Sequence, residues 1–222
     1  MSTGPKAPGG QTIQPTIERV SPDIVQAARA LPASTLHESG GRIGALPAAI
    51  KPIDVAFRIC GTAVTVHGPS GDNLWLHRAI YVAQPGEVLV AHVSGGYDFG
   101  YWGEIMSSAA RERGLAGLVI DGCVRDGGVL PEVGFPVFAR GLSMRGTGKD
   151  YGAVGWINFP ILMGDVVVAA GDLIVGDTDG IVALPRARAP AIVNSAAERE
   201  AKESEILRRL ASGERTLEIY QF

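Results

Sequence analysis

The sequence predicts a single α/β domain in which β-rich layers carry flanking helices. Six short runs rich in β-branched residues are bounded by Gly, Pro or Asp, as the ends of strands are. Helical patterns with one apolar face separate some of these runs. The 222 residues are 46% hydrophobic and 19% charged and include 30 Gly and 14 Pro. That composition is typical of a compact, turn-rich domain and excludes a disordered or coiled-coil chain.

The N-terminal part is expected to contain a short arm followed by a helix. Residues 1–12 are mostly Gly, Pro and polar, so we expect a frayed arm in front of a single domain over residues 13–222. Ser21 suits the N-cap of a helix whose first position is Pro22, and Pro32 ends that helix.

The rest of the chain alternates between predicted strands and helices. A second short helix is expected to begin at Ser34 and to close at Gly40. Strands are predicted over residues 56–66, 87–93, 117–122, 136–140, 165–177 and 180–185. Amphipathic helices are predicted over residues 73–83 and 103–114 and from Pro190 onwards, where Gly213 interrupts the last one.

Composition also excludes several classes of function. A net charge of −3 offers no field to neutralise phosphates, so nonspecific nucleic-acid binding is not expected. Cys60 and Cys123 are too few for a disulfide scaffold and are expected to be free buried thiols. The four histidines lack zinc spacing, and four lysines leave few candidates for Schiff-base chemistry. The sequence has neither a membrane-length apolar run nor a signal peptide, so we expect a cytoplasmic protein with no membrane partner.

The segment from Gly103 to Asp126 predicts a small-molecule site. It contains a helix start, a buried strand and a loop, and these parts meet at one end of a layered sheet, where ligand crevices form. Free backbone N–H groups at the helix start would bind an anion. Arg125 offers a planar fork to a carboxylate or enolate, and Asp126 offers oxygen to a hard cation such as Mg²⁺. The predicted substrate-binding residues are Gly103, Glu104, Ile105, Met106 and Arg125.

Each of these residues also has a structural interpretation. Adjacent Arg and Asp side chains are common in solvated turns. Glu104 at the start of a helix complements the helix dipole. Asp121, which ends the buried strand, is interpreted as a turn residue.

The loops before this segment are open to two interpretations as well. Asp72 followed by Asn73 is typical of a helix cap, although the surrounding glycines superficially resemble a phosphate loop. His77 lies one turn into that helix and is interpreted as a packed histidine. The aromatic residues over 97–102 suit a pocket wall or lid as well as a packed loop.

Six stretches in the order of the chain carry a resemblance to a known family. They include GDNLWLHRAI and VIDGCVRD and cover residues 35–46, 61–66, 71–80, 85–92, 103–126 and 163–185. Together they resemble the RraA-like family. Within it they are most similar to the divalent-metal aldolases of 4-hydroxy-4-methyl-2-oxoglutarate and 4-carboxy-4-hydroxy-2-oxoadipate. The resemblance implies a swivelling β/β/α fold and a homotrimer or homohexamer with sites between protomers.

The resemblance also implies roles for individual residues. Arg125 would hold the pyruvyl part of the substrate and stabilise its enolate. Asp126 would ligate Mg²⁺ or Mn²⁺, and Glu104 would orient a water on that metal. A glutamate from the C-terminal helix of a neighbouring chain would complete the water network, with Glu203 as the first choice and Glu200 as the reserve.

The implied activity is retro-aldol cleavage of a 4-hydroxy-2-oxo acid to pyruvate and a second 2-oxo acid, with oxaloacetate decarboxylation as a side activity. One departure concerns the subgroup, because Val129 stands where these aldolases carry an acidic residue; Glu132 lies nearby in the sequence. The alternatives are a non-catalytic regulator of ribonuclease activity that binds protein, and an enzyme of the same fold acting on another 2-oxo or hydroxy acid.

Overall fold

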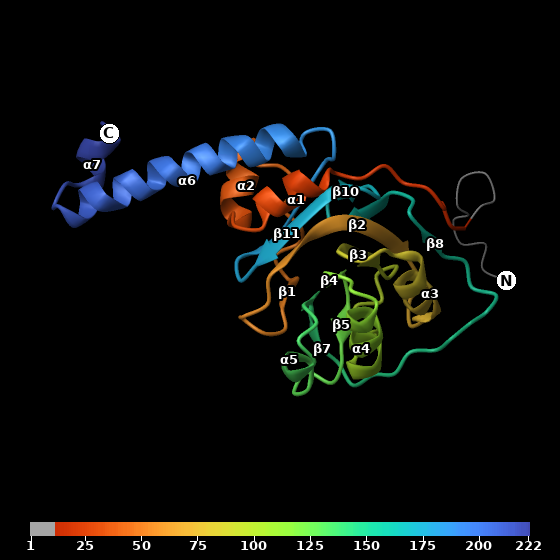
Figure 1. Cartoon of the computed structure of the whole chain (residues 1–222). Coiled ribbons are helices and arrows are strands. Elements are labelled where there is room, and N and C mark those ends of the chain that lie inside the picture. Colours follow the sequence, from red (N-terminus) through yellow and green to blue (C-terminus); the bar gives the residue numbers. More distant parts are fainter. Residues whose placement is uncertain (1–11) are drawn as a thin grey trace.

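The computed structural model describes residues 12–222 (Figure 1). The predicted frayed arm lies outside this range apart from Thr12, whose carbonyl accepts a hydrogen bond from the Ile157 amide at 2.9 Å. The helices are α1 (Pro22–Ala28), α2 (Ala33–Ser39), α3 (Leu74–Val82), α4 (Glu104–Glu112), α5 (Leu130–Val133), α6 (Ala189–Ala211) and α7 (Thr216–Ile219). The strands are β1 (Lys51–Pro52), β2 (Ile59–His67), β3 (Glu87–His92), β4 (Gly117–Ile120), β5 (Cys123–Val124), β6 (Val137–Ala139), β7 (Gly141–Leu142), β8 (Trp156–Ile157), β9 (Ile161–Met163), β10 (Val166–Val168), β11 (Leu173–Asp177) and β12 (Gly180–Leu184).

One mixed sheet organises the described part of the chain. Its strands follow the order β1-β6-β4-β3-β2-β11-β12, and β8 also pairs with β2. The central strands β6, β4, β3 and β2 are parallel, whereas β1, β11 and β12 pair antiparallel. Because β1 and β12 contact each other, the sheet curls into a nearly closed barrel. The predicted α/β class is confirmed.

Alternating side chains of the parallel strands face two different cores. In β2, Val64 and Val66 pack toward α3 and α4, whereas Ala63 faces the barrel interior. In β3, Leu89 points toward the helices and Val90 toward the interior. This alternation follows from the two-residue period of a strand. Since both faces are buried, the strands are continuous apolar runs.

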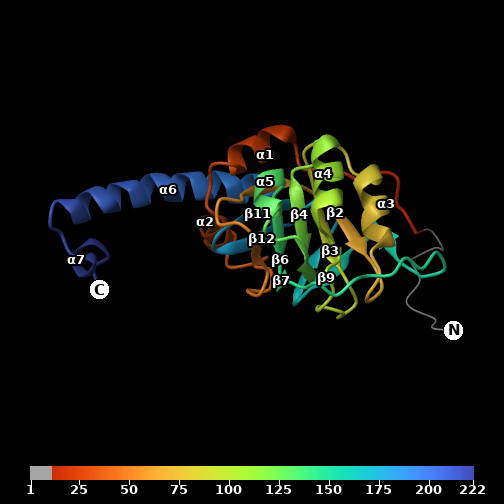
Figure 2. The same ribbon diagram turned by 90° about the horizontal axis from the view of Figure 1, so that it is seen from below.

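Two groups of helices pack on the outer face of the curled sheet (Figure 1). α3, α4 and α5 cover the parallel strands, and α1, α2 and the first turns of α6 pack with β11 and β12. Ile192, Val193 and Ala196 of α6 pack in a cluster with α1, α2, β11 and β12. Beyond Ala196, α6 has no buried residue and extends away from the sheet (Figure 2). We call residues 199–222 the C-terminal arm.

The run predicted as one strand over residues 165–177 is two strands, β10 and β11, so that prediction is wrong. Gly171 separates them with a left-handed φ of +93°. A Cβ at this position would lie 1.9 Å from the Glu18 carbonyl oxygen, so only glycine fits. Asp172 stabilises the turn because its carboxylate accepts hydrogen bonds from the amides of Ala169 and Arg186, both at 2.9 Å.

The other predicted elements are confirmed with small shifts of their ends. The helices predicted over residues 73–83 and 103–114 are α3 and α4, and the long C-terminal helix is α6 with its break at Gly213. The strands β1, β5, β7 and β8, each of two residues, were not predicted because two residues carry no periodic pattern. Within residues 12–222, no helix is long and apolar enough to cross a membrane.

Candidate functional site

Arg125, Asp126 and the start of α4 meet at one place, beyond the carboxyl end of β4. The Glu104 amide donates a hydrogen bond of 3.0 Å to Oδ2 of Asp126, and Nε of Arg125 lies 3.7 Å from the same oxygen. Asp126 has a left-handed φ of +62°, a conformation that Asp tolerates better than most residues. The Arg125 amide donates to the Trp102 carbonyl at 2.8 Å, which ties the loop after β5 to the chain that enters α4.

Gly103 makes this close approach possible. A Cβ at this position would lie 2.2 Å from Oδ2 of Asp126 and 3.0 Å from Cγ of Arg125. Both distances are shorter than ordinary contacts, so any side chain would displace the Asp126 carboxylate. The helix start and the Arg-Asp loop are therefore in contact because residue 103 has no side chain.

The predicted anion site is smaller than expected. The amide of Glu104 is one of the predicted donors, but Asp126 already accepts its hydrogen. The amides of Gly103, Ile105 and Met106 have no acceptor among residues 12–222. Thus three of the four predicted backbone donors remain without an acceptor, beside one carboxylate and one guanidinium.

A cavity of about 210 Å³ opens beside these groups. It includes four of the predicted site residues, Gly103, Ile105, Met106 and Arg125. The remaining wall comes from α3, from the turn before α4 and from the loop after β7, and consists of Asn73, His77, Gly100, Tyr101, Trp102, Gly146, Thr147 and Lys149. The side chain of Glu104 is exposed and does not line the cavity.

Asn73 contributes an unused acceptor to the wall. Its Nδ2 donates to the Tyr101 carbonyl at 2.9 Å, whereas its Oδ1 is buried without a hydrogen-bond partner among the described residues. Only 7% of the residue is exposed. A buried acceptor without a donor is costly, so a ligand hydroxyl or a water that donates to it would relieve that cost.

His77 and Lys149 bring nitrogen donors to the same wall. Burial lowers the pKa of His77, and the nearby Lys149 ammonium lowers it further, although Asp72 acts in the opposite direction. The imidazole is therefore neutral near pH 7. The interpretation of His77 as a purely packed residue is incomplete because it lines the cavity.

Lys149 reaches the cavity because its loop is anchored to the start of α3. The Gly148 amide donates to the Gly71 carbonyl at 2.7 Å, and the carboxylate of Asp72 accepts the Asp150 amide. The other Asp72 oxygen accepts the Leu74 amide at 2.8 Å, which confirms the predicted cap. Sequence reasoning missed this contact because the two segments lie far apart in the chain, and no local pattern links them.

Glu203 and Glu200 lie on α6, away from this cavity in their own chain (Figures 1 and 2). Glu203 accepts a hydrogen bond from Arg199 at 2.8 Å at the base of the C-terminal arm. Glu200 accepts one from Thr35 at 2.6 Å, which holds it against α2. The prediction that one of them serves a neighbouring chain stays a prediction, and the contact to Thr35 makes Glu200 the less available of the two.

Asp121 is more than a turn residue. It is 2% exposed, and its Oδ1 accepts a hydrogen bond of 2.6 Å from Nε of Arg140. The guanidinium of Arg140 also lies over the ring of Tyr97, 3.9 Å from its centre. These two contacts hold the end of β4 against the loop over residues 97–102. Arg140 therefore has a structural role.

Val129 follows the site loop and contributes no polar atom from its side chain. Its amide donates to the Asp126 carbonyl at 2.9 Å, which closes a turn between the metal-ligand candidate and α5. Glu132 lies on α5 with an exposed side chain and has no ion-pair partner in the described part of the chain.

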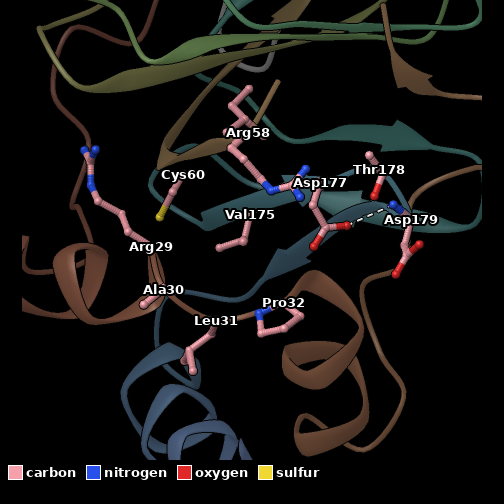
Figure 3. A pocket seen from close by; sticks show the side chains of 12 residues that line it. Arg29, Ala30, Leu31, Pro32, Arg58, Cys60, Val175, Asp177, Thr178 and Asp179 are labelled. Carbon is pink, nitrogen blue, oxygen red and sulfur yellow. Dashed lines mark hydrogen bonds between the residues drawn. The ribbon is translucent and has the colours of Figure 1, made fainter. Parts of the chain in front are cut away.

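A second cavity of about 460 Å³ lies near the opposite end of β2 (Figure 3). Its wall includes Arg29, Arg58, Cys60 and Asp177. Asp177 accepts the amides of Ala33 at 2.9 Å and of the following turn at 3.0 Å, so it serves the backbone. Burial raises the pKa of Cys60 to about 11, and both cysteines are free and half-buried, as neutral thiols. This cavity contains none of the predicted site residues.

The residues around Asp126 fit one kind of metal ion. No group of three or more His, Cys, Asp or Glu side chains suited to a metal occurs within residues 12–222. Asp126 nevertheless has Oδ1 without a hydrogen-bond or ion-pair partner in this range. Mg²⁺ commonly binds through one or two carboxylates and keeps waters and substrate oxygens as its other ligands. A single carboxylate therefore suits Mg²⁺ or Mn²⁺ and does not suit a zinc site.

Comparison with known proteins identifies the family. The model of the RraA-like family, described as Aldolase/RraA, matches residues 21–183. A relative from Halalkalibacterium halodurans with the provisional name 4-hydroxy-4-methyl-2-oxoglutarate aldolase is 31% identical over 198 residues, which cover 89% of this chain and 93% of the relative.

Solved structures agree with that family. An uncharacterized protein from Pseudomonas syringae is 26% identical with a TM-score of 0.79, covering 93% of this chain and 100% of that one. RraAS2 from Streptomyces coelicolor, described as an unusual member of the RNase ES inhibitor RraA protein family, is 29% identical with a TM-score of 0.75, covering 87% of this chain and 99% of that one. With its curled mixed sheet and these relatives, the chain belongs to the RraA-like family.

Proposed function

We propose that the protein is a lyase that cleaves a 4-hydroxy-2-oxo acid to pyruvate and a second 2-oxo acid. The observation that carries the proposal is the contact between Asp126, Arg125 and the start of α4 beside a small cavity. A site that forms an enolate needs a carboxylate to hold a metal ion, a positive charge beside the enolate oxygen and backbone donors for the substrate carboxylate. Asp126, Arg125 and the start of α4 offer these groups. The name of the Halalkalibacterium relative supports the same reaction class.

The pyruvyl half of the substrate would bind first to fixed donors. Its carboxylate would accept hydrogen bonds from the amides of Ile105 and Met106, which the helix dipole makes favourable. Arg125 would donate to the 2-keto oxygen. A Mg²⁺ or Mn²⁺ ion held by Asp126 would polarise that keto group as a Lewis acid.

Cleavage would then require a base for the 4-hydroxyl group. Loss of this proton breaks the C3–C4 bond, forms the carbonyl of the second 2-oxo acid and leaves the bonding electrons on the pyruvate enolate. Glu104 and Glu203 of the partner subunit would hold the water that accepts this proton. Protonation of C3 completes pyruvate, while Arg125 stabilises the enolate oxygen by about 3 kcal/mol.

This mechanism requires that subunits assemble so that the C-terminal arm reaches a neighbouring cavity. We propose a homotrimer or homohexamer. Oxaloacetate would be decarboxylated as a side activity, because loss of CO₂ forms the same enolate. Val129 places no carboxylate near the site, so another 2-oxo or hydroxy acid with the same pyruvyl unit is the second candidate substrate.

The test is a screen for pyruvate release from 4-hydroxy-2-oxo diacids and oxaloacetate, with added Mg²⁺ or Mn²⁺ and with EDTA. We expect activity only with metal, and a loss of about 10²-fold or more in Arg125→Ala. Arg113→Ala, at the far end of α4, is the matched control and should keep activity. Equal turnover in EDTA, or an Arg125→Ala variant as active as the control, would exclude the mechanism.

A non-catalytic regulator is the alternative that the Streptomyces structure favours. The two functions differ in what they bind. A regulator of ribonuclease activity would lower RNA cleavage by its target and would release no pyruvate from any of these acids. Binding of Mg²⁺ and oxalate, measured by calorimetry and lost in Asp126→Asn, would support the enzyme instead.

A further inference from the structure

Two histidines that the proposed reaction does not use form a pair beside the cavity loops. His67 ends β2 and His92 ends β3, and parallel pairing places them side by side. Their Nδ1 atoms lie 3.0 Å apart, and the ring of His67 stacks on Trp156 with 3.8 Å between ring centres. His67 is 9% exposed.

Only one hydrogen can lie between the two Nδ1 atoms. One imidazole must donate and the other must accept, so the accepting ring is neutral in this arrangement. If His92 donates, Nε2 of His67 carries a hydrogen toward Oγ of Ser94 at 3.3 Å, and that hydroxyl donates to the Gly68 carbonyl at 2.9 Å. A proton bound at Nδ1 of the accepting ring would place two donors face to face without an acceptor, whereas a proton bound at Nε2 of the donating ring would leave the hydrogen bond intact.

Ser94 connects this pair to two loops. It has a left-handed φ of +51° and bridges the turn after β3 to the turn after β2. The Tyr101 hydroxyl makes a second bridge, since it accepts the Gly71 amide at 2.9 Å and donates to the Gly96 carbonyl at 2.6 Å.

The two bridged loops carry part of the cavity wall. Residues 68–73 lead into Asn73, and residues 94–103 lead into Gly103 and α4. Because the same hydrogen bonds join both loops, a movement at the turns would be transmitted to both walls.

We propose that His67 and His92 form an acid-sensitive latch that positions loops 68–73 and 94–103 of the candidate site. The latch is closed while Nδ1 of His67 accepts the proton on Nδ1 of His92, and it opens when His67 itself is protonated at Nδ1. Its effect on catalysis rests on the proposed function, whereas its effect on the loops does not.

The surroundings favour the neutral pair. Burial and, to a smaller extent, the neighbouring His92 lower the pKa of His67 to about 4. Burial also lowers the pKa of His92, although Asp121 at the end of β4 raises it. Arg140 pairs with Asp121 and so reduces that effect. Ser94 and Trp156, the other groups in contact with His67, carry no charge.

The direction of the pH effect follows from the lowered pKa. A histidine that binds protons less well in the closed state favours opening as pH falls below its ordinary value of 6.5, until about 4. From these two values, lowering the pH from about 7 to about 5 raises the equilibrium constant for opening about 20-fold through His67 alone.

Hydrogen exchange measured by mass spectrometry on the full chain tests the latch without substrate. After correction for the intrinsic effect of pH, we expect amides in loops 68–73 and 94–103 to lose about 20-fold protection between pH 7 and 5. His92→Asn should reduce this change, because its amide offers His67 an acceptor that does not titrate, whereas the burial of His67 remains. His37→Asn, a histidine hydrogen-bonded to the Ile43 carbonyl, is the matched control and should keep it.

Two results would overturn the latch. One is loop protection that does not change with pH in the natural chain, and the other is a change of undiminished size in His92→Asn. Should that variant fail to fold, NMR titration of the imidazoles in the natural chain decides, since His67 protonated at pH 6 with the loops unchanged would also refute the proposal. Neither measurement depends on aldolase activity, so a failed latch and a failed lyase are separate outcomes.

Discussion

Replacing Gly103 by alanine should disable the candidate site without removing any side chain from it. The new Cβ would lie 2.2 Å from Oδ2 of Asp126, about one ångström closer than a normal contact. The new Cβ would also lie 3.0 Å from Cγ of Arg125, so it cannot move toward Arg125 to relieve the clash with Asp126. The Asp126 carboxylate must therefore move away from the helix start.

The magnitude follows from the bond that is broken. The Glu104 amide would lose its charge-assisted hydrogen bond to Asp126, now 3.0 Å long, which is worth about 1.5–3 kcal/mol. Alanine at an N-cap costs about 0.5–1 kcal/mol more than glycine. We therefore expect the free energy of unfolding to fall by about 2–4 kcal/mol. If Asp126 and Arg125 act on the substrate, kcat/KM falls by about 10²-fold or more.

Gly128→Ala is the matched control on the same loop, because its added Cβ would meet no atom within 4 Å. Urea unfolding and pyruvate release, measured on both variants, separate stability from activity. The expected pattern is a loss of both in Gly103→Ala and of neither in Gly128→Ala. Full kcat/KM in Gly103→Ala would show that the contact between Asp126 and the helix start has no part in catalysis.

Three further predictions concern the same groups. Asp126→Asn keeps a residue that tolerates the φ of +62°, so we expect normal unfolding in urea but loss of Mg²⁺ binding by calorimetry; retained binding would place the metal elsewhere. If Glu203 acts across subunits, mixing inactive Arg125→Ala and Glu203→Ala chains in equal amounts should restore about a quarter of the sites, and no recovery of pyruvate release would refute that arrangement. Because the pKa of His67 is lowered to about 4, the free energy of unfolding should fall by up to about 3 kcal/mol as the pH drops from 6.5 toward 4. Chemical unfolding at several pH values measures this dependence, which should be weaker in His92→Asn.

Local patterns in the sequence were sufficient for most of the fold. The helix from Gly103 and the apolar strand after it follow from periodicity and glycine boundaries, and their meeting at one end of the sheet follows from parallel pairing. The break at Gly171 was missed because it depends on the Glu18 carbonyl, which lies far away in sequence. A contact of this kind has no local signal.

The same limit applies to the candidate site. Arg125 and Asp126 could be predicted because they are adjacent and follow a strand. Asn73 and Lys149 could not, because a loop anchored by Asp72 brings them together. The histidine pair could not be predicted either. The spacing of the histidines along the chain excludes a zinc motif, but the contact between His67 and His92 depends on the register of two paired strands.

The size of the cavity bears on how the site is completed. At about 210 Å³ it is smaller than the range of about 300–1,000 Å³ typical of pockets for larger ligands, so one chain encloses little more than a pyruvyl unit. The second half of a 4-hydroxy-2-oxo diacid would extend beyond this wall. In its own chain Glu203 lies on an arm that leaves the sheet, away from this cavity. An arm of this kind on a neighbouring chain is therefore suited to cover the outer half of the substrate. The neighbour's contribution, together with Val129, would decide which diacid is cleaved.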